Sequence, residues 1–257
     1  MRASAAVALA ALLLAGFPAG TAHADSDPDV LWRFVHEQCV PDQQANLNPA
    51  PCAAVDLSAG IDRGHAVFKD YVGDHQYLLI PTTRITGIED PALLRPDAPN
   101  YLADAWRTRA FTESSAGGAL PRDWIGLAVN GAVARTQNQL HIHIDCLRAD
   151  VHRTLRDFAG AIGPVWAPLP VPLAGSRYDA LAVDDLDAVN PFALAAAGAD
   201  PALLTLAVVG TGTESHPGFV VLRSQADPAA GVLPAAELLQ DHTRCPAPLP
   251  PGPFTSK

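Results

Sequence analysis

Two histidines stand one residue apart in the segment 138–146, where polar and apolar residues alternate. This period of two predicts a β-strand with two unlike faces. The apolar side chains should enter a core: Leu140, Ile142 and Ile144. The opposite face should carry a polar row, with side chains about 6.6 Å apart along the strand: Gln139, His141, His143 and Asp145. Such a row suits a rigid platform for an anion, a metal ion or a nucleophile better than it suits packing.

Three interpretations of the paired histidines are open from these residues alone. In the first, both imidazoles and Asp145 bind zinc, although ligands in one row need a partner from another strand, and the chain has no H-E-x-x-H motif. In the second, one histidine attacks phosphorus and its neighbour binds the phosphate, which needs no metal when an acceptor fixes the ring tautomer. In the third, both are solvated histidines on an exposed strand.

Hydrogen-bond donors crowd the approach to this strand. They occupy five consecutive positions: Arg135, Thr136, Gln137, Asn138 and Gln139. Donors at such a place could offset the charge on phosphoryl oxygens. The chain has neither a G-x-S-x-G motif nor a Walker loop, so no motif indicates a serine hydrolase or a P-loop enzyme.

The composition predicts a globular protein whose main partner is not nucleic acid. Of the 257 residues, 49% are hydrophobic and 17% are charged, which is enough apolar material for a sizeable core. The formal net charge of −10 argues against nucleic acid, since a surface that tracks phosphates is basic. A small anionic substrate is still compatible, because a local cluster of cations or histidines can outweigh the global sign.

Residues 1–24 have the features of a targeting segment. Arg2 precedes an apolar run over 5–17, and Ala22-His23-Ala24 resembles a signal-peptidase site. As a helix this run spans only about 20 Å, short of the roughly 30 Å of a bilayer core. We therefore predict a cleaved signal peptide, with a retained N-terminal membrane anchor as the alternative. Either one places the protein in the cell envelope, outside the cytoplasm.

Four cysteines fit an exported protein: Cys39, Cys52, Cys146 and Cys245. No C-x-x-C pair is present, which disfavours a zinc knuckle. Of the three possible pairings we favour two disulfides, Cys39–Cys52 within a polar loop and Cys146–Cys245 between the histidine strand and the end of the chain. Reduced thiols are the alternative.

The remaining patterns predict a single α+β domain over 25–245 with a mostly antiparallel sheet. Helices are expected at 28–39, 98–114, 150–162, 184–197 and 234–241. Strands are expected at 64–70, 76–80, 124–130, 139–147, 203–209 and 218–222. Residues 41–51 and 163–175 should be loops, and Asp150 should cap the helix that it begins. The Pro-rich residues 246–257 should be disordered.

The histidine strand resembles the motif of the histidine-triad (HIT) superfamily of nucleotide hydrolases and transferases. That motif is His-φ-His-φ-His-φ-φ, with the middle histidine as nucleophile. Gln139 stands at its first position here, so His141 matches the nucleophile and His143 matches the third histidine. Glutamine can position a neighbour by hydrogen bonds but cannot take up a proton.

The resemblance extends upstream of the motif. Residues 66–70 and 76–81 are similar to the first hairpin of the superfamily, in which Asp70 matches the residue that holds the nucleotide ribose. Residues 127–130 are similar to the strand whose terminal residue, Asn130, approaches the phosphate.

A closer resemblance, over residues 29–245, is to the family of bacterial CDP-diacylglycerol pyrophosphatases. It rests on segments 43–44, 48–52, 77–81, 84–87, 135–138, 141–146 and 240–245. The resemblance implies an HIT-like fold with a C-terminal β-hairpin extension. It also implies hydrolysis of CDP-diacylglycerol to CMP and phosphatidate at a membrane surface, without a metal or another cofactor.

The resemblance also implies roles for individual residues. His141 would be the nucleophile, His143 would bind the phosphate and Asp70 would hold the ribose. Positioning of His141 or of the phosphate would fall to Asn130, Thr136 and Gln139. Compensation of pyrophosphate charge would fall to Lys69, Arg84 and Arg135. Two other functions stay open: an HIT-type hydrolase of soluble nucleotides, and a non-catalytic envelope protein that binds nucleotide-linked lipids.

Overall fold

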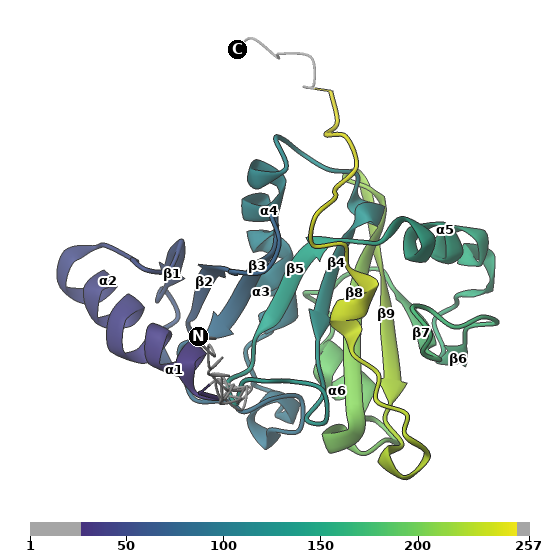
Figure 1. Ribbon diagram of the computed structural model, residues 1–257, viewed down its shortest axis with the longest axis horizontal. Helices are drawn as coiled ribbons and strands as arrows, with labels where there is room; N and C mark the ends of the chain where they lie inside the picture. The colour runs from purple at the N-terminus through teal and green to yellow at the C-terminus, as the bar shows by residue number, and fades with distance from the viewer. Residues whose placement is uncertain (1–26, 251–257) are drawn as a thin grey trace, which may run out of the picture.

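The computed structural model describes residues 27–250, which form one nine-stranded sheet with helices on both faces (Figure 1). The strands are β1 (Ala54–Asp56), β2 (His65–Lys69), β3 (Tyr77–Pro81), β4 (Ile125–Val129), β5 (Ile142–Cys146), β6 (Ala167–Pro168), β7 (Asp179–Val183), β8 (Leu204–Thr213) and β9 (His216–Gln225). Their order is β1-β2-β3-β5-β4-β8-β9-β7-β6, and every neighbouring pair is antiparallel. The predicted α+β class and the hairpins β2–β3 and β8–β9 are confirmed.

The two faces of the sheet are covered differently. The helices are α1 (Val30–Arg33), α2 (Val40–Asn46), α3 (Tyr101–Thr108), α4 (Ala110–Ser115), α5 (Ala149–Asp157) and α6 (Pro191–Ala196). On one face, α3 and α6 pack through Trp106 and Phe192 onto a single core cluster. The other face carries two clusters, one beneath α1 and one beneath α5. Figure 1 shows α1 and α2 at one end of the sheet and α5 at the other.

The polar row of β5 fills the gap between these two clusters. His143 pairs with Leu78 of β3, which belongs to the cluster beneath α1, and with Ala128 of β4, which belongs to the cluster beneath α5. On the opposite face, Ile142 and Ile144 enter the single large core, as the alternation predicts. The histidines therefore lie where neither apolar cluster closes over the sheet.

The N-terminal helix continues through a segment expected to be a loop. A π-helical stretch, Phe34–Cys39, joins α1 to α2, and the helix ends only at Asn46. The expectation of a loop over 41–51 is therefore wrong for its first part. Pro41 lies in the first turn after this stretch, where the π-helical and α-helical hydrogen-bond patterns meet.

Three further differences concern helix ends. The helix expected over 98–114 is two helices, α3 and α4, separated by Arg109. Asp150 does not cap α5; it lies in the first turn, and its carboxylate accepts hydrogen bonds from the guanidinium of Arg148, the residue at the N-cap. The helix expected over 184–197 shortens to α6, because Asn190 caps it by accepting from two backbone N–H groups.

Three short strands and one short helical turn also differ from the expected elements. Strands β1, β6 and β7 were not expected, and β6 lies within the predicted irregular stretch 163–175. The helix expected over 234–241 is a single 3₁₀ turn, Ala236–Leu239.

Both predicted disulfides are confirmed: Cys39–Cys52 and Cys146–Cys245. Beyond Cys245, the N–H of Leu249 donates to the carbonyl oxygen of Ala119, which gives this part of the expected tail a defined place. The expected targeting segment, and the last residues of the tail, lie outside the described residues. Within 27–250, no helix is long and apolar enough to cross a membrane.

The two disulfides close loops of different length, with sequence separations of 13 and 99 residues. The chain-entropy model gives about 3 kcal/mol for a short loop and nearly 5 kcal/mol for a long one. We expect Cys146→Ser/Cys245→Ser to lower the free energy of unfolding more than Cys39→Ser/Cys52→Ser does. Urea titration of both double variants measures this difference, and a larger loss from the short loop would contradict it.

Candidate active site

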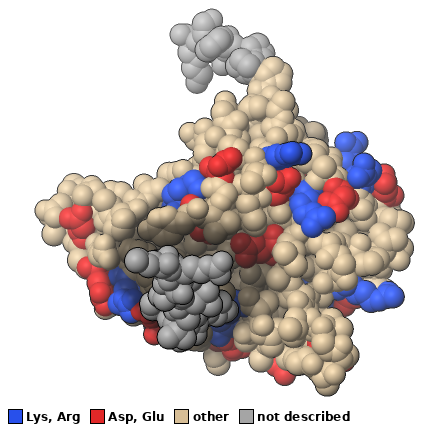
Figure 2. Space-filling view, viewed as in Figure 1, with Lys and Arg blue, Asp and Glu red and all other residues tan. Residues whose placement is uncertain are grey.

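A pocket of about 330 Å³ opens over β5, in the gap between the two apolar clusters. Its apolar side comes from α1, the π-helical stretch and the β2–β3 hairpin: Val30, Leu31, Phe34, Phe68, Tyr71, Val72 and Leu78. Its polar side brings together Asp70, Asn130, Thr136, Gln137, His141, His143 and Glu237. Lys and Arg side chains are scattered over the face of the described residues seen in Figure 2, and form no basic patch there.

His141 is held as a neutral imidazole with one defined tautomer. Its Nδ1 lies 2.7 Å from the backbone carbonyl oxygen of Gln139, so Nδ1 carries the proton and donates it to this acceptor. Burial, and to a lesser degree His143, lower the pKa of His141 to about 4. The lone pair therefore resides on Nε2, and the ring is uncharged at neutral pH, as nucleophilic attack requires.

His143 has the opposite tautomer. The side-chain amide of Gln76 donates one hydrogen to Asp70 Oδ2 at 2.6 Å and the other to His143 Nδ1 at 2.8 Å. Burial lowers the pKa of His143 to about 4, so the ring is neutral and its proton lies on Nε2. That Nε2–H is buried and has no partner among residues 27–250. It is a donor available to an anion in the pocket.

Glu237 reaches the pocket from the C-terminal 3₁₀ turn, and sequence reasoning missed it. Its Oε2 accepts from the amide of Asn130 at 3.0 Å, and its backbone N–H donates to Asn130 Oδ1 at 3.2 Å. Its Oε1 lies 3.6 Å from His143 Nδ1 and 3.6 Å from His242 Nε2. The helix expected over 234–241 includes Glu237, but nothing in the sequence around it indicates contact with Asn130, 107 residues away.

Asp145, the next polar residue along β5 after His143, binds the C-terminal segment. It is fully buried, and its Oδ2 accepts from His242 Nδ1 at 3.0 Å. Burial raises the pKa of Asp145, and the hydrogen bond to Asp145 raises the pKa of His242. His242 thus connects β5 to the C-terminal segment.

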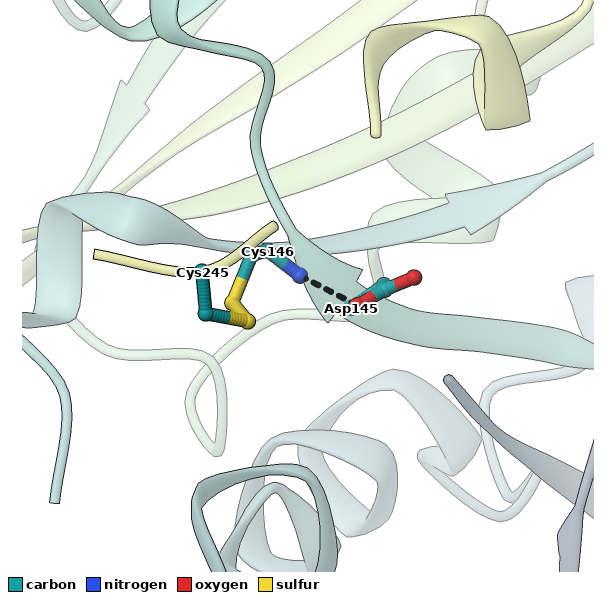
Figure 3. A group of neighbouring side chains, drawn as sticks. All are labelled: Asp145, Cys146 and Cys245. Carbon is teal, nitrogen blue, oxygen red and sulfur yellow. Dashed lines mark hydrogen bonds between the residues drawn. A yellow bond between two sulfur atoms is a disulfide. The ribbon is translucent and has the colours of Figure 1, made fainter. Parts of the chain in front are cut away.

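Figure 3 shows Asp145 beside the Cys146–Cys245 disulfide, with Asp145 Oδ1 accepting from the backbone N–H of Cys146 at 2.8 Å. In the described part of the chain, these three residues are the one group of metal-type ligands that lie within 4.8 Å of one another. Both sulfurs belong to the disulfide, so no thiolate is available to bind an ion. The zinc interpretation of His141, His143 and Asp145 gains no support from this arrangement.

Four residues expected to contact substrate do not line the pocket. Lys69 donates to the carbonyl oxygens of Asp70 and Gly73. Arg84 pairs with Asp29, and Arg135 pairs with Glu89 at 2.6 Å. Gln139 is buried, and its amide donates to the carbonyl oxygens of Pro81 and Thr83. These side chains fasten loops and strand ends, whereas Asp70, Asn130 and Thr136 lie at the pocket as expected.

A second cavity, of about 310 Å³, lies between α5 and the β8–β9 hairpin. Its histidine, His152, already bonds Asp123 at 2.9 Å and stacks on Trp124. No unpaired nucleophile or donor pair comparable to His141 and His143 lines this cavity, so the pocket over β5 is the candidate active site.

The fold and the pocket together define an α+β protein with a neutral histidine pair suited to attack on phosphorus. The family of CDP-diacylglycerol pyrophosphatases matches residues 26–247. The chain is 38% identical to a Yersinia pestis protein named CDP-diacylglycerol pyrophosphatase over 222 residues. This aligned stretch covers 85% of this chain and 84% of that protein. The chain belongs to the CDP-diacylglycerol pyrophosphatase family, which confirms the closer of the two resemblances, the one over residues 29–245.

The depressed pKa values of His141 and His143 make stability depend on pH. In the unfolded chain both rings take up protons below about 6.5, whereas in the folded protein they do so only near pH 4. Between these values the unfolded state binds more protons, so the free energy of unfolding should fall as the pH drops. We expect His141→Gln and His143→Gln each to flatten this fall. Urea midpoints measured from pH 7 to 4 test it, and slopes equal to wild type would contradict it.

Proposed function

We propose that this protein hydrolyses the pyrophosphate bond of CDP-diacylglycerol to CMP and phosphatidate, with His141 as a covalent nucleophile. Membership of the family supports the substrate and the reaction. The observation that carries the mechanism is the hydrogen bond from His141 Nδ1 to the carbonyl of Gln139. This bond leaves the Nε2 lone pair of a neutral imidazole available at the pocket.

In the first step, Nε2 of His141 attacks the cytidylyl phosphorus, and the bond to the bridging oxygen breaks. Phosphatidate leaves with that electron pair, and a cytidylyl-histidine remains. The leaving oxygen belongs to a phosphate monoester whose second pKa is about 6, so it departs without a strong acid. This fits Gln139 at the first motif position, because an amide cannot supply a proton. Water then attacks phosphorus, the P–N bond breaks, and CMP is released.

The pocket supplies donors for the charge that develops on the phosphoryl oxygens. His143 would donate from Nε2, which has no partner among the described residues. Thr136 and the amide of Asn130 lie at the same pocket and would position the phosphate. Asp70, already oriented by Gln76, would accept from the ribose hydroxyls.

The same proposal places the protein in the cell envelope, with the pocket facing a membrane surface. Two disulfides support an oxidising compartment. Exposed apolar side chains adjoin the pocket residues in sequence and form what we term the rim: Tyr71, Val72, Val133 and Leu238. Apolar groups at this place could enter the interface that holds a diacylglycerol substrate.

The nucleophile is tested by His141→Asn, which keeps a polar side chain but removes the Nε2 lone pair. We expect CMP release from CDP-diacylglycerol to fall by at least about 1,000-fold. His143→Asn should lower CMP release by about 100-fold, the effect of removing one hydrogen-bond donor to the phosphoryl group. The exposed His36 provides the matched control, and His36→Asn should retain wild-type turnover. Near wild-type CMP release by folded His141→Asn would refute the mechanism.

The rim is tested by Val133→Ser/Leu238→Ser, since neither residue lines the pocket. We expect hydrolysis of CDP-diacylglycerol in phospholipid vesicles to slow by at least about tenfold, because the two substitutions remove side-chain carbons and about 0.8 kcal/mol is lost for each one that had entered the interface. Hydrolysis of a short-chain, water-soluble analogue should not change. An equal loss on both substrates would contradict a membrane contact.

A further inference from the structure

The C-terminal segment closes one side of the pocket, although the mechanism above assigns it no role. Gln240 anchors this segment by donating to the carbonyl oxygens of Gly126 and His143, at 2.7 and 3.1 Å. The carbonyl of His242 accepts from the N–H of Asp74 in the β2–β3 turn. A Cβ at Gly73 would come within 2.3 Å of that same carbonyl oxygen, so the segment and the turn are in close contact. These contacts fix the backbone after Glu237, and the hydrogen bond from the Asn130 amide to Oε2 holds its carboxylate at the pocket.

We propose that Glu237 is a catalytic base, which accepts the proton of the water that hydrolyses the cytidylyl-histidine. This inference rests on the proposed covalent mechanism and assigns its second step. That step needs a proton acceptor at the pocket, because a neutral water is a weak nucleophile.

The hydrogen bonds of the pocket leave one oxygen free for this task. Asp70 is occupied at both oxygens, since Oδ1 accepts from the N–H of Val72 and Oδ2 accepts from Gln76. Glu237 accepts from Asn130 at Oε2 only. Its Oε1 has no hydrogen-bond donor within 27–250, as the nearest ring nitrogens, in His143 and His242, are 3.6 Å away.

The other titratable groups of the pocket are committed elsewhere. Nδ1 of His143 accepts from Gln76, and its Nε2 carries the proton. His141 is bonded to phosphorus in the intermediate, and its Nδ1–H is held by Gln139. Gln139 has no basic atom and lies away from the pocket. Of the two carboxylates that line the pocket, Asp70 is assigned to the ribose, and Glu237 is thus the one with an oxygen that accepts no hydrogen bond from residues 27–250.

The step balances as follows. Water loses a proton to Oε1 of Glu237 while its oxygen bonds to the cytidylyl phosphorus. The P–N bond breaks, and its electron pair returns to Nε2 of His141. CMP leaves, and Glu237 gives its proton to solvent, with which its side chain is in contact through an exposed fraction of 27%.

The test is Glu237→Gln, which preserves the size of the side chain and its oxygen towards Asn130. Phosphatidate and CMP are followed separately after rapid mixing with CDP-diacylglycerol. We expect a burst of phosphatidate equal to the enzyme concentration at nearly the wild-type rate. Steady-state CMP release should fall by about 100-fold or more, while cytidylyl-enzyme accumulates. The matched control is Glu37→Gln, an exposed residue of the π-helical stretch, which should behave as wild type.

Azide separates a base from a structural role, because an anionic nucleophile needs no proton acceptor. It should restore turnover of the cytidylyl-enzyme in Glu237→Gln, and Glu237→Asp should retain intermediate turnover. The inference is overturned if both products slow together without a burst, if azide has no effect, or if Glu237→Gln turns over normally. If no variant accumulates cytidylyl-enzyme and His141→Asn remains active, the covalent mechanism itself fails, which is a different outcome.

Discussion

The hydrogen bond between His141 Nδ1 and the carbonyl of Gln139 is the interaction on which the site depends. A buried imidazole that lacked this acceptor could exchange its two tautomers, and its lone pair would face the pocket only part of the time. Attack also requires an uncharged ring. Burial provides this, because it lowers the pKa of His141 to about 4. The backbone thus sets the tautomer, and the surrounding apolar clusters set the charge.

This arrangement requires a gap between two apolar clusters on one face of a sheet. The cluster beneath α1 ends at Leu78, and the cluster beneath α5 ends at Ala128, the two residues that flank His143 in register. Segments distant in sequence close the sides of the gap. The β2–β3 hairpin brings Asp70, and the C-terminal turn brings Glu237, from a chain end that Cys245 fixes to β5. The site is therefore assembled from several elements and depends on the whole sheet.

The sequence could predict whatever local pattern encodes. Alternation around Ile142 identified the strand, its two faces and the paired histidines, and the cysteine count, together with the expectation of export, led to both disulfides. Family motifs located Asp70 and Asn130 at the pocket. Local sequence patterns did not predict the contacts between residues that are distant in the chain. Glu237 meets Asn130 across 107 residues, from a segment that was expected to be a helix and is a 3₁₀ turn.

The same limit explains the cations that do not reach the pocket. Arg84 and Arg135 pair with Asp29 and Glu89, and nothing in the spacing of these residues indicates either pair. The helix through Pro41 is a related case, since a π-helical stretch before a proline has no sequence signature. In each case the outcome is set by tertiary contacts, which a single sequence does not display.

The central claim, a covalent cytidylyl-histidine, is tested most directly by stereochemistry at the cytidylyl phosphorus. The substrate would be CDP-diacylglycerol with one sulfur at that phosphorus in a single configuration, hydrolysed in ¹⁸O-labelled water. Two successive displacements, first by His141 and then by water, predict net retention of configuration. Net inversion would mean that water attacks the substrate directly, and it would contradict the account.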